Sequence, residues 1–197
     1  MTDSQRLERR AALVQLMRHR GDAALVTGLG SPTYDAYAAG DSPNNFYLWG
    51  GMGGAAMLGL GLALAQPGRR VVVWTGDGDM LMGLGSLATI AVAKPENLTI
   101  LVVDNEHYGE TGMQLAHTGR GVDLVGIAKA AGISDSTLVT TQQELEALSG
   151  RLFTGAGLRF AAIKVGTQDA PAAVPSLDGP YLRTRFRLAM VGENAFG

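Results

Sequence analysis

Two short polar motifs contain the residue types that hold phosphate groups and metal ions. Gly76-Asp77-Gly78 places a carboxylate between two residues without side chains, and Asp104-Asn105 follows later in the chain. Glycines let backbone N–H groups approach phosphate oxygens closely. Carboxylate and amide oxygens suit Mg²⁺, which completes its shell with phosphate oxygens and water. The first motif alone is also ordinary turn chemistry. The two motifs together favour a site for magnesium and phosphate.

Each motif directly follows an apolar run that predicts a strand buried on both faces, at 71–75 and 98–103. Further strands are expected at 23–27, 46–49, 136–140 and 159–165. Helices are expected at 4–20, 31–39, 80–93, 123–131 and 142–153, with a small-residue helix that ends at Ala65. This alternation predicts an α/β fold: a doubly wound, mostly parallel six-stranded sheet with helices on both faces. The carboxyl ends of parallel strands share one rim, so the two motifs should meet there.

Composition limits the class of protein. The 197 residues, 46% of them hydrophobic, are enough for one domain over 1–197, and the net charge of −2 gives no reason to expect nucleic acid as a partner. The apolar run at 55–65 is too short and too rich in glycine to span a membrane, and the Arg-rich start lacks a secretory pattern, so a cytoplasmic protein is expected. The absence of cysteine excludes iron–sulfur clusters, cysteine-bound zinc and thiol nucleophiles.

The motifs resemble those of enzymes that depend on thiamin diphosphate (ThDP). The stretch from Gly76 to Asn105 is similar to the Gly-Asp-Gly to Asn motif of that family, with Asp104 where many members have a first Asn. The runs 49–53 and 104–114 are similar to the β-type chains of sulfopyruvate and phosphonopyruvate decarboxylases. The resemblance covers roughly residues 25–165. It implies a ThDP-binding fold of the type that holds the diphosphate and magnesium.

The same resemblance assigns roles to individual residues. Asp77, Asn105 and the carbonyl of His107 would hold Mg²⁺. The Gly50 carbonyl would accept a hydrogen bond from the 4′-amino group of the cofactor, and Met52 would be the apolar wedge that keeps the cofactor bent, although a methionine is also a common core filler. The contacts to the diphosphate and its turn would come from Gly30, Ser31, Gly76, Gly78, Asp79 and Met80.

The resemblance also implies a partner. Members of the family decarboxylate 2-oxo acids and use a glutamate that protonates N1′ of the cofactor's pyrimidine. That glutamate belongs to a separate pyrimidine-binding domain, and no glutamate of this chain stands in a matching context. We therefore expect a hetero-oligomer in which a pyrimidine-domain subunit supplies the glutamate.

Two further segments allow more than one interpretation. His107, Tyr108 and Glu110 are candidates for proton transfer to the substrate, or their loop merely closes over the cofactor. Residues 168–197 form a tail that is expected to contact a partner. On an extended strand, Arg183, Arg185 and Arg187 would share one face, which could bind an anion or form a solvated edge or subunit contact.

Three functions stay open at this point. The chain is a subunit of a ThDP- and Mg²⁺-dependent 2-oxoacid decarboxylase, or of a related carboligase that passes the same intermediate to an aldehyde. From another class, it is a non-catalytic phosphate-binding module that retains the Gly-Asp-Gly turn. The last alternative predicts binding that does not depend on Mg²⁺.

Overall fold

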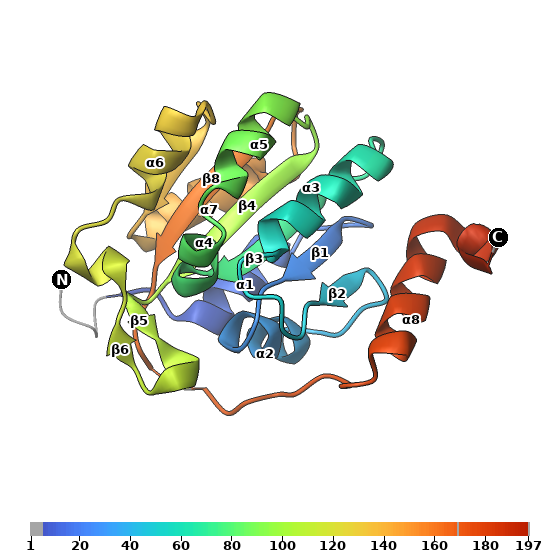
Figure 1. Ribbon diagram of the computed structural model, residues 1–197, viewed down its shortest axis with the longest axis horizontal. Helices are drawn as coiled ribbons and strands as arrows, with labels where there is room; N and C mark the ends of the chain where they lie inside the picture. The colour runs from blue at the N-terminus through green and yellow to red at the C-terminus, as the bar shows by residue number, and fades with distance from the viewer. Residues whose placement is uncertain (1–5, 169, 197) are drawn as a thin grey trace.

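A parallel β-sheet forms the centre of the molecule (Figure 1). The computed structural model describes residues 6–168 and 170–196. In the order β2-β1-β3-β4-β8-β7, all neighbouring strands of this sheet pair in parallel, which confirms the predicted α/β fold. The strands are β1 (Ala24–Thr27), β2 (Asn45–Tyr47), β3 (Val71–Gly76), β4 (Leu98–Asp104), β7 (Ser136–Val139) and β8 (Arg159–Lys164).

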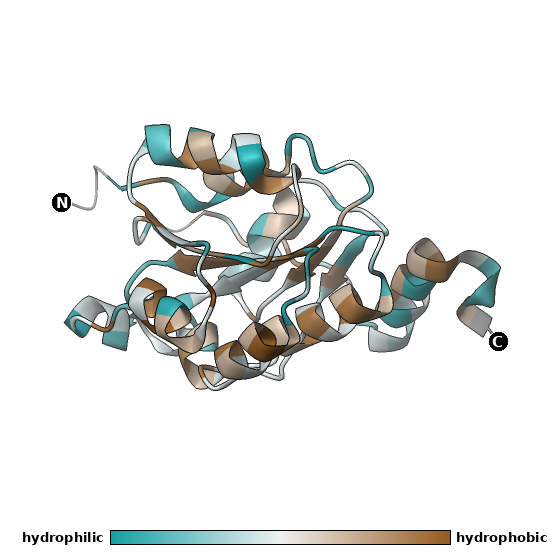
Figure 2. Ribbon diagram, turned by 90° about the horizontal axis from the view of Figure 1, so that it is seen from above, coloured by the Kyte–Doolittle hydropathy of each residue, from teal (hydrophilic) through white to brown (hydrophobic). Residues whose placement is uncertain are grey.

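Helices cover both faces of the sheet, because side chains that alternate along each strand are apolar on both sides. Val71 and Val73 pack into one core cluster, while Val72 and Trp74 pack into the other. Figure 2 shows the hydrophobic strands between two layers of helices. The first cluster is covered by α3 (Ala55–Ala65), α4 (Asp77–Met82), α5 (Ser86–Ala93) and α6 (Leu124–Ala131), and the second by α1 (Arg9–Met17), α2 (Ser31–Ala38) and α7 (Gln142–Leu152).

The strand order reverses between β1 and β3. From β1 the chain passes through α2 to β2 on one side, whereas from β3 it passes through α4 and α5 to β4 on the other. The carboxyl ends of β1 and β3 therefore form a crevice at a topological switch point, where sheets of this kind bind ligands. Helix α1 runs back toward β1, so its first turn lies at the same rim.

Two segments differ from the sequence prediction. The helix expected at 80–93 is divided into α4 and α5, because Gly83 packs directly on the backbone of Gly53: a Cβ at Gly83 would lie 2.1 Å from that carbonyl oxygen. The predicted helix at 4–20 begins at Arg9, where the Glu8 side chain accepts hydrogen bonds from the first backbone N–H groups. The start of that prediction, residues 4 and 5, lies outside the described residues.

The loop after β4 folds into a small hairpin that the sequence did not predict. Strands β5 (His107–Tyr108) and β6 (Gln114–Leu115) pair antiparallel, with the 3₁₀ turn η2 (Gly109–Thr111) between them. A second 3₁₀ turn, η3 (His117–Arg120), returns the chain to the sheet. The hairpin stands beside α4 at the carboxyl rim (Figure 1).

The expectation of an extended strand at Arg183, Arg185 and Arg187 is wrong. These residues lie on α8 (Gly179–Val191), which Asp178 caps by accepting from the Tyr181 N–H at 3.0 Å, with a short η4 (Gly192–Phe196) after it. Residues two apart on a helix point in nearly opposite directions, so the three arginines do not share a face. Helix α8 lies beside β2 (Figure 1).

Within the described part of the chain, no helix is long and apolar enough to span a bilayer.

Candidate functional site

A cavity of about 160 Å³ lies at the switch point. Its walls come from the loop after β1, the turn between β3 and α4, the end of β4, the hairpin and the first turn of α1. Gly30, Gly50 and Met80 of the predicted set do not line it. The predicted residues that do are Ser31, Met52, Gly76, Asp77, Gly78, Asp79, Asn105, His107, Tyr108 and Glu110.

Two buried carboxylates meet at the floor of the site. Asp77 and Asp104 are each only 2% exposed, and the Thr118 hydroxyl lies 2.9 Å from Asp77 Oδ2 and 2.8 Å from Asp104 Oδ1. One hydroxyl hydrogen satisfies only one of these two acceptors at a time. Burial, and then the charge of Asp104, raise the pKa of Asp77 to about 7. The site therefore has an excess of buried negative charge that a bound cation would offset.

Lys164 neutralises part of this charge. Its Nζ lies 2.8 Å from Asp104 Oδ2 and 2.8 Å from Glu106 Oε1, and Arg6 holds the other oxygen of Glu106 at 2.8 Å. Burial lowers the pKa of Lys164, but the hydrogen bonds that its ammonium group donates to both acids keep that pKa above its usual value. Asp104, which departs from the family pattern, is thus paired within the chain, whereas the Asp77 carboxylate has no cationic partner among the described residues.

Asn105 and His107, the other residues that the sequence predicted as metal donors, line the same cavity as Asp77. Asn105 Oδ1 accepts the backbone N–H of His107 at 3.0 Å, and the His107 ring Nδ1 pairs with the Asn105 carbonyl at 2.8 Å. Among the described residues, no group of three or more His, Asp or Glu side chains is arranged to hold a metal. A carboxylate, an amide oxygen and a backbone carbonyl suit Mg²⁺ that completes its shell with phosphate oxygens and water. This donor set fits Mg²⁺ and does not fit a zinc site.

The turn after β3 is shaped for close approach by a ligand. Gly76 ends the strand in an extended conformation, and α4 begins at Asp77, so the N–H groups of its first turn have no partner within the helix. A Cβ at Gly78 would lie 2.8 Å from the ring of Tyr108 and 3.5 Å from Met52 Cε. Gly78 is thus in contact with both the hairpin and the Met52 loop.

The Asp79 side chain connects the loops around the cavity. Its carboxylate accepts hydrogen bonds from the Gly53 N–H and from the Thr75 hydroxyl. A Cβ at Gly28 would lie 2.3 Å from Asp79 Oδ2, so the end of β1 packs tightly on the same carboxylate. The side chain of Asp79 therefore positions the Gly50 to Gly53 loop, and its own backbone N–H stays in the first turn of α4.

Met52 and Gly50 belong to the loop between β2 and α3. Met52 is 37% exposed and lines the cavity, which argues against its use as a core filler. Gly50 has a φ of +76°, and a Cβ added there would meet nothing within 4 Å. Glycine permits this left-handed conformation and leaves the backbone open to the outside.

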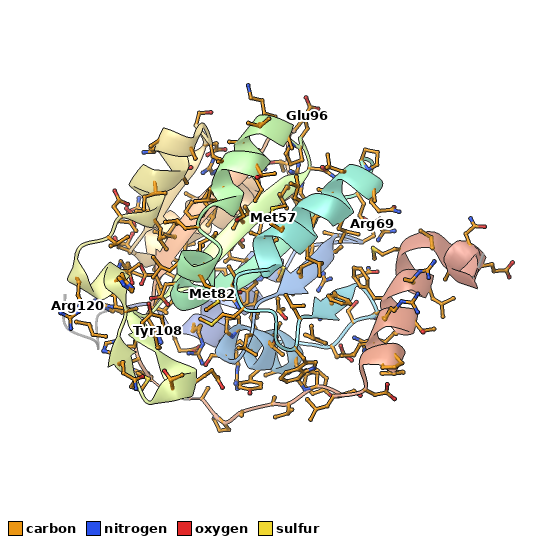
Figure 3. All side chains as sticks on the ribbon, in the orientation of Figure 1. Met57, Arg69, Met82, Glu96, Tyr108 and Arg120 are labelled. Atoms are coloured by element: carbon orange, nitrogen blue, oxygen red, sulfur yellow. The ribbon has the colours of Figure 1, made fainter. Side chains whose placement is uncertain are left out.

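The hairpin places three predicted catalytic residues around the cavity. The Tyr108 hydroxyl and His117 Nδ1 lie 2.8 Å apart, and Figure 3 labels Tyr108 on the hairpin. Glu110 reaches Gly30, where a Cβ would lie 2.4 Å from Glu110 Oε1. The hairpin thus closes one side of the cavity with polar side chains.

The sequence interpretation missed Arg9, Thr118 and Lys164. Thr118 and Lys164 join the site only through folding, since each lies far along the chain from Asp77. Arg9 could have been noticed in the sequence, because two adjacent arginines in the first turn of a helix interact unfavourably with the helix dipole. Arg9 is buried and lines the cavity.

Comparison with known proteins identifies the family of this chain. The thiamine pyrophosphate enzyme C-terminal TPP-binding domain matches residues 30–165. The chain belongs to the thiamine pyrophosphate enzyme family. The matched residues include most of the segments that surround the cavity, from the start of α2 to the end of β8, whereas Arg9 and Leu29 of its wall lie before the match.

Relatives of this TPP-binding domain include decarboxylases of two lengths. The sulfopyruvate decarboxylase subunit beta of Methanothermobacter thermautotrophicus is 36% identical over 180 residues, which cover 91% of this chain and 94% of that protein. The phosphonopyruvate decarboxylase of Streptomyces viridochromogenes is 40% identical over 168 residues, which cover 84% of this chain but 42% of that protein.

Among solved structures, the benzoylformate decarboxylase of Polynucleobacter necessarius has a TM-score of 0.69 at 24% identity, and the match covers 84% of this chain and 34% of that one. The thiamine diphosphate-dependent 4-hydroxybenzoylformate decarboxylase of Rhodococcus jostii has the same TM-score at 21% identity, with the same coverage. At these identities the likeness supports the fold alone.

Proposed function

We propose that this chain is the diphosphate- and magnesium-binding subunit of a ThDP-dependent decarboxylase that acts on a 2-oxo acid similar to sulfopyruvate or phosphonopyruvate. The observation that carries the proposal is the cavity that joins the Asp77 turn, Asn105 and Met52 at the switch point of a TPP-binding domain. The names and identities of the decarboxylase relatives support the reaction class.

The chain's own residues would bind and orient the cofactor. Asp77, Asn105 and the His107 carbonyl would hold Mg²⁺. When bound, ThDP supplies the carbanion that adds to the 2-oxo acid and the electron sink for loss of CO₂. Met52, in contact range of Gly78, would keep the pyrimidine folded over the thiazolium, and the Gly50 carbonyl would accept from its amino group. Backbone N–H groups of Gly78, Asp79 and Met80, aided by Gly30 and Ser31, would hold the diphosphate.

Proton transfer to the reacting carboxylate or product falls to the hairpin. His107, Tyr108 and Glu110 all line the cavity, and the Tyr108 hydroxyl is connected to His117. In this arrangement His117 would orient the Tyr108 hydroxyl and exchange protons with solvent, since it lies exposed at the outside of the loop.

A second subunit would supply the glutamate that the cofactor's pyrimidine needs. Among the described residues that line the cavity, the one glutamate is Glu110, whose carboxylate reaches Gly30 at the start of α2, whereas a Cβ at Gly50 would meet nothing within 4 Å. Large apolar side chains are exposed on α3, α4 and α5, as expected for a surface covered by another chain; Figure 3 shows Met57 and Met82 among them. They are Met57 at 39%, Leu64 at 57%, Met82 at 65% and Val92 at 85% exposure. The hetero-oligomer, a partner at residues 168–197 and a cytoplasmic location all stay predictions.

Metal-dependent cofactor binding tests the proposal. We expect the wild-type chain to bind ThDP by calorimetry in the presence of Mg²⁺ and to lose that binding in chelator. Asp77→Ala should abolish the Mg²⁺-dependent part, while Asp22→Ala, a change at an exposed carboxylate, should not. Binding of ThDP with equal affinity with and without Mg²⁺ would support a phosphate-binding module instead. A carboligase is distinguished afterwards by adding an aldehyde acceptor and identifying the product.

A further inference from the structure

Arg9 is a buried cation in the wall of the cofactor cavity. It lies in the first turn of α1, is 9% exposed, and shares the cavity wall with Ser31, Pro32 and Asp77. Its Nε donates to the Asp35 carboxylate, and its Nη2 lies 3.5 Å from the other Asp35 oxygen. In the described part of the chain, its Nη1 has no hydrogen-bond partner.

The described residues do not use every hydrogen-bond donor of Arg9. Asp35 is fully buried and serves two arginines, since Arg10 Nε also lies 3.3 Å from its Oδ1. Asp35 and Glu8, whose carboxylate caps this end of α1, offset the charges of the two arginines. The hydrogen bonds to Asp35 use Nε and Nη2 of Arg9, so Nη1 stays available in a side chain that lines the cavity, and a charged donor of this kind suits a bound anion.

Arg9 is also placed opposite the metal donors. It lies on the side of the sheet covered by α1 and α2, whereas α4, which carries Asp77, covers the other side. Among the described cavity-lining residues it is the only lysine or arginine; the acids are Asp77, Asp79 and Glu110. The Glu110 carboxylate reaches Gly30 at the start of α2.

We propose that Arg9 binds the terminal phosphoryl group of the cofactor's diphosphate, with Asp35 holding the guanidinium in position and Mg²⁺ neutralising the diphosphate from the Asp77 side. This inference rests on the proposed function. Arg9 would add a charged, directional hydrogen bond that the glycine-rich turn cannot supply. The same guanidinium chemistry would also suit an anionic group on the substrate, and the experiment separates the two sources.

Binding of ThDP is compared with binding of thiamin monophosphate, which lacks the terminal phosphoryl group. Calorimetry in Mg²⁺ on the full chain gives both dissociation constants for wild type, Arg9→Met, Arg9→Lys and Arg10→Met. Arg10 is the matched control, because it also pairs with Asp35 but does not line the cavity. Asp35 keeps one arginine partner in each variant, and thermal melting checks that each is folded.

We expect Arg9→Met to weaken ThDP binding about 10- to 100-fold, the range for a hydrogen bond to a charged group, and to change monophosphate binding less than about threefold. Arg9→Lys should fall between, since one ammonium cannot hold Asp35 and the phosphoryl group with the same geometry. If Arg9→Met does not fold, Arg9→Lys is compared with wild type instead. Arg10→Met should leave the ratio of the two affinities unchanged.

Equal weakening of both ligands by the Arg9 variants, or no weakening of either, would overturn the inference. Unchanged cofactor binding with a raised KM for a dianionic 2-oxo acid, measured with the partner subunit, would move Arg9 to the substrate. If wild type binds neither ligand in Mg²⁺, the proposed function itself fails. That outcome is distinct from wild-type binding that Arg9 does not influence.

Discussion

Asp77→Asn separates the energetic cost of burying a carboxylate from the use of that carboxylate at the metal site. Asp77 is 2% exposed and lies beside Asp104, with one hydroxyl between them. Burial and the Asp104 charge raise its pKa from 3.8 to about 7. Because the pKa is higher in the folded than in the unfolded state, the folded protein binds more protons between these values. The metal-free protein therefore loses stability as pH rises from about 4 to about 7.

The size of this loss follows from the same values. At about 1.4 kcal/mol per pH unit, ionisation of Asp77 costs the metal-free fold about 4 kcal/mol above pH 7. Asparagine has nearly the same shape, still accepts from Thr118 and offers an N–H group toward Asp104. We expect Asp77→Asn to stabilise the metal-free protein by about 2–4 kcal/mol at pH 8, with the gain shrinking by about 1.4 kcal/mol per pH unit below pH 7.

Urea denaturation at pH 5 and pH 8, each in chelator and in Mg²⁺, measures this. Mg²⁺ should stabilise only the wild type, by about 2.7 kcal/mol when its concentration is 100 times the dissociation constant. A variant that is less stable than wild type at pH 8 in chelator would refute the electrostatic reasoning. Equal stabilisation of both proteins by Mg²⁺ would refute the assignment of Asp77 as a ligand.

Three further substitutions test the framework of the site. Gly28→Ala should destabilise the protein by about 1–3 kcal/mol in thermal melting, because its Cβ would lie 2.4 Å from Thr75 Oγ1. Gly61→Ala, an exposed position on α3 where a Cβ would meet nothing within 4 Å, should not destabilise it. Arg185→Ala removes the ion pair with Asp41 at 2.6 Å, so it should lower the free energy of unfolding by about 1 kcal/mol and speed amide exchange in residues 179–191. Arg187 has no ion pair in the described structure, so Arg187→Ala should not speed this exchange. Met52→Ala should change stability by less than about 1 kcal/mol, since Met52 is 37% exposed. The same variant should slow C2-proton exchange of bound ThDP. Exchange at the wild-type rate would contradict the role of Met52 as a wedge.

The features that could be predicted from sequence are those fixed by local pattern. Apolar runs at β3 and β4 predict buried parallel strands, and strand polarity alone then brings Asp77 and Asn105 to one rim. The glycines of the turns could also be recognised without knowledge of the fold. These local signals were enough for the fold and for most of the cavity's walls.

The features that sequence missed depend on distant contacts. Thr118 reaches Asp77 across 41 positions, and Lys164 meets Asp104 only because β8 pairs with β4. The division of α4 from α5 depends on Gly53 lying against Gly83. The alternating arginines near the end fit a strand and a helix equally well, and capping by Asp178 together with packing of Phe186 on Phe46 favours the helix.

Reconstitution of decarboxylation tests the central claim most directly. The chain is mixed with a candidate pyrimidine-domain subunit, ThDP and Mg²⁺, and CO₂ release is followed from sulfopyruvate, phosphonopyruvate and pyruvate. We expect release from at least one of these acids by the mixture, none by either chain alone, and loss of release when the mixture contains Asp77→Ala. Turnover by the purified chain alone would contradict the claim that a second subunit supplies the missing glutamate.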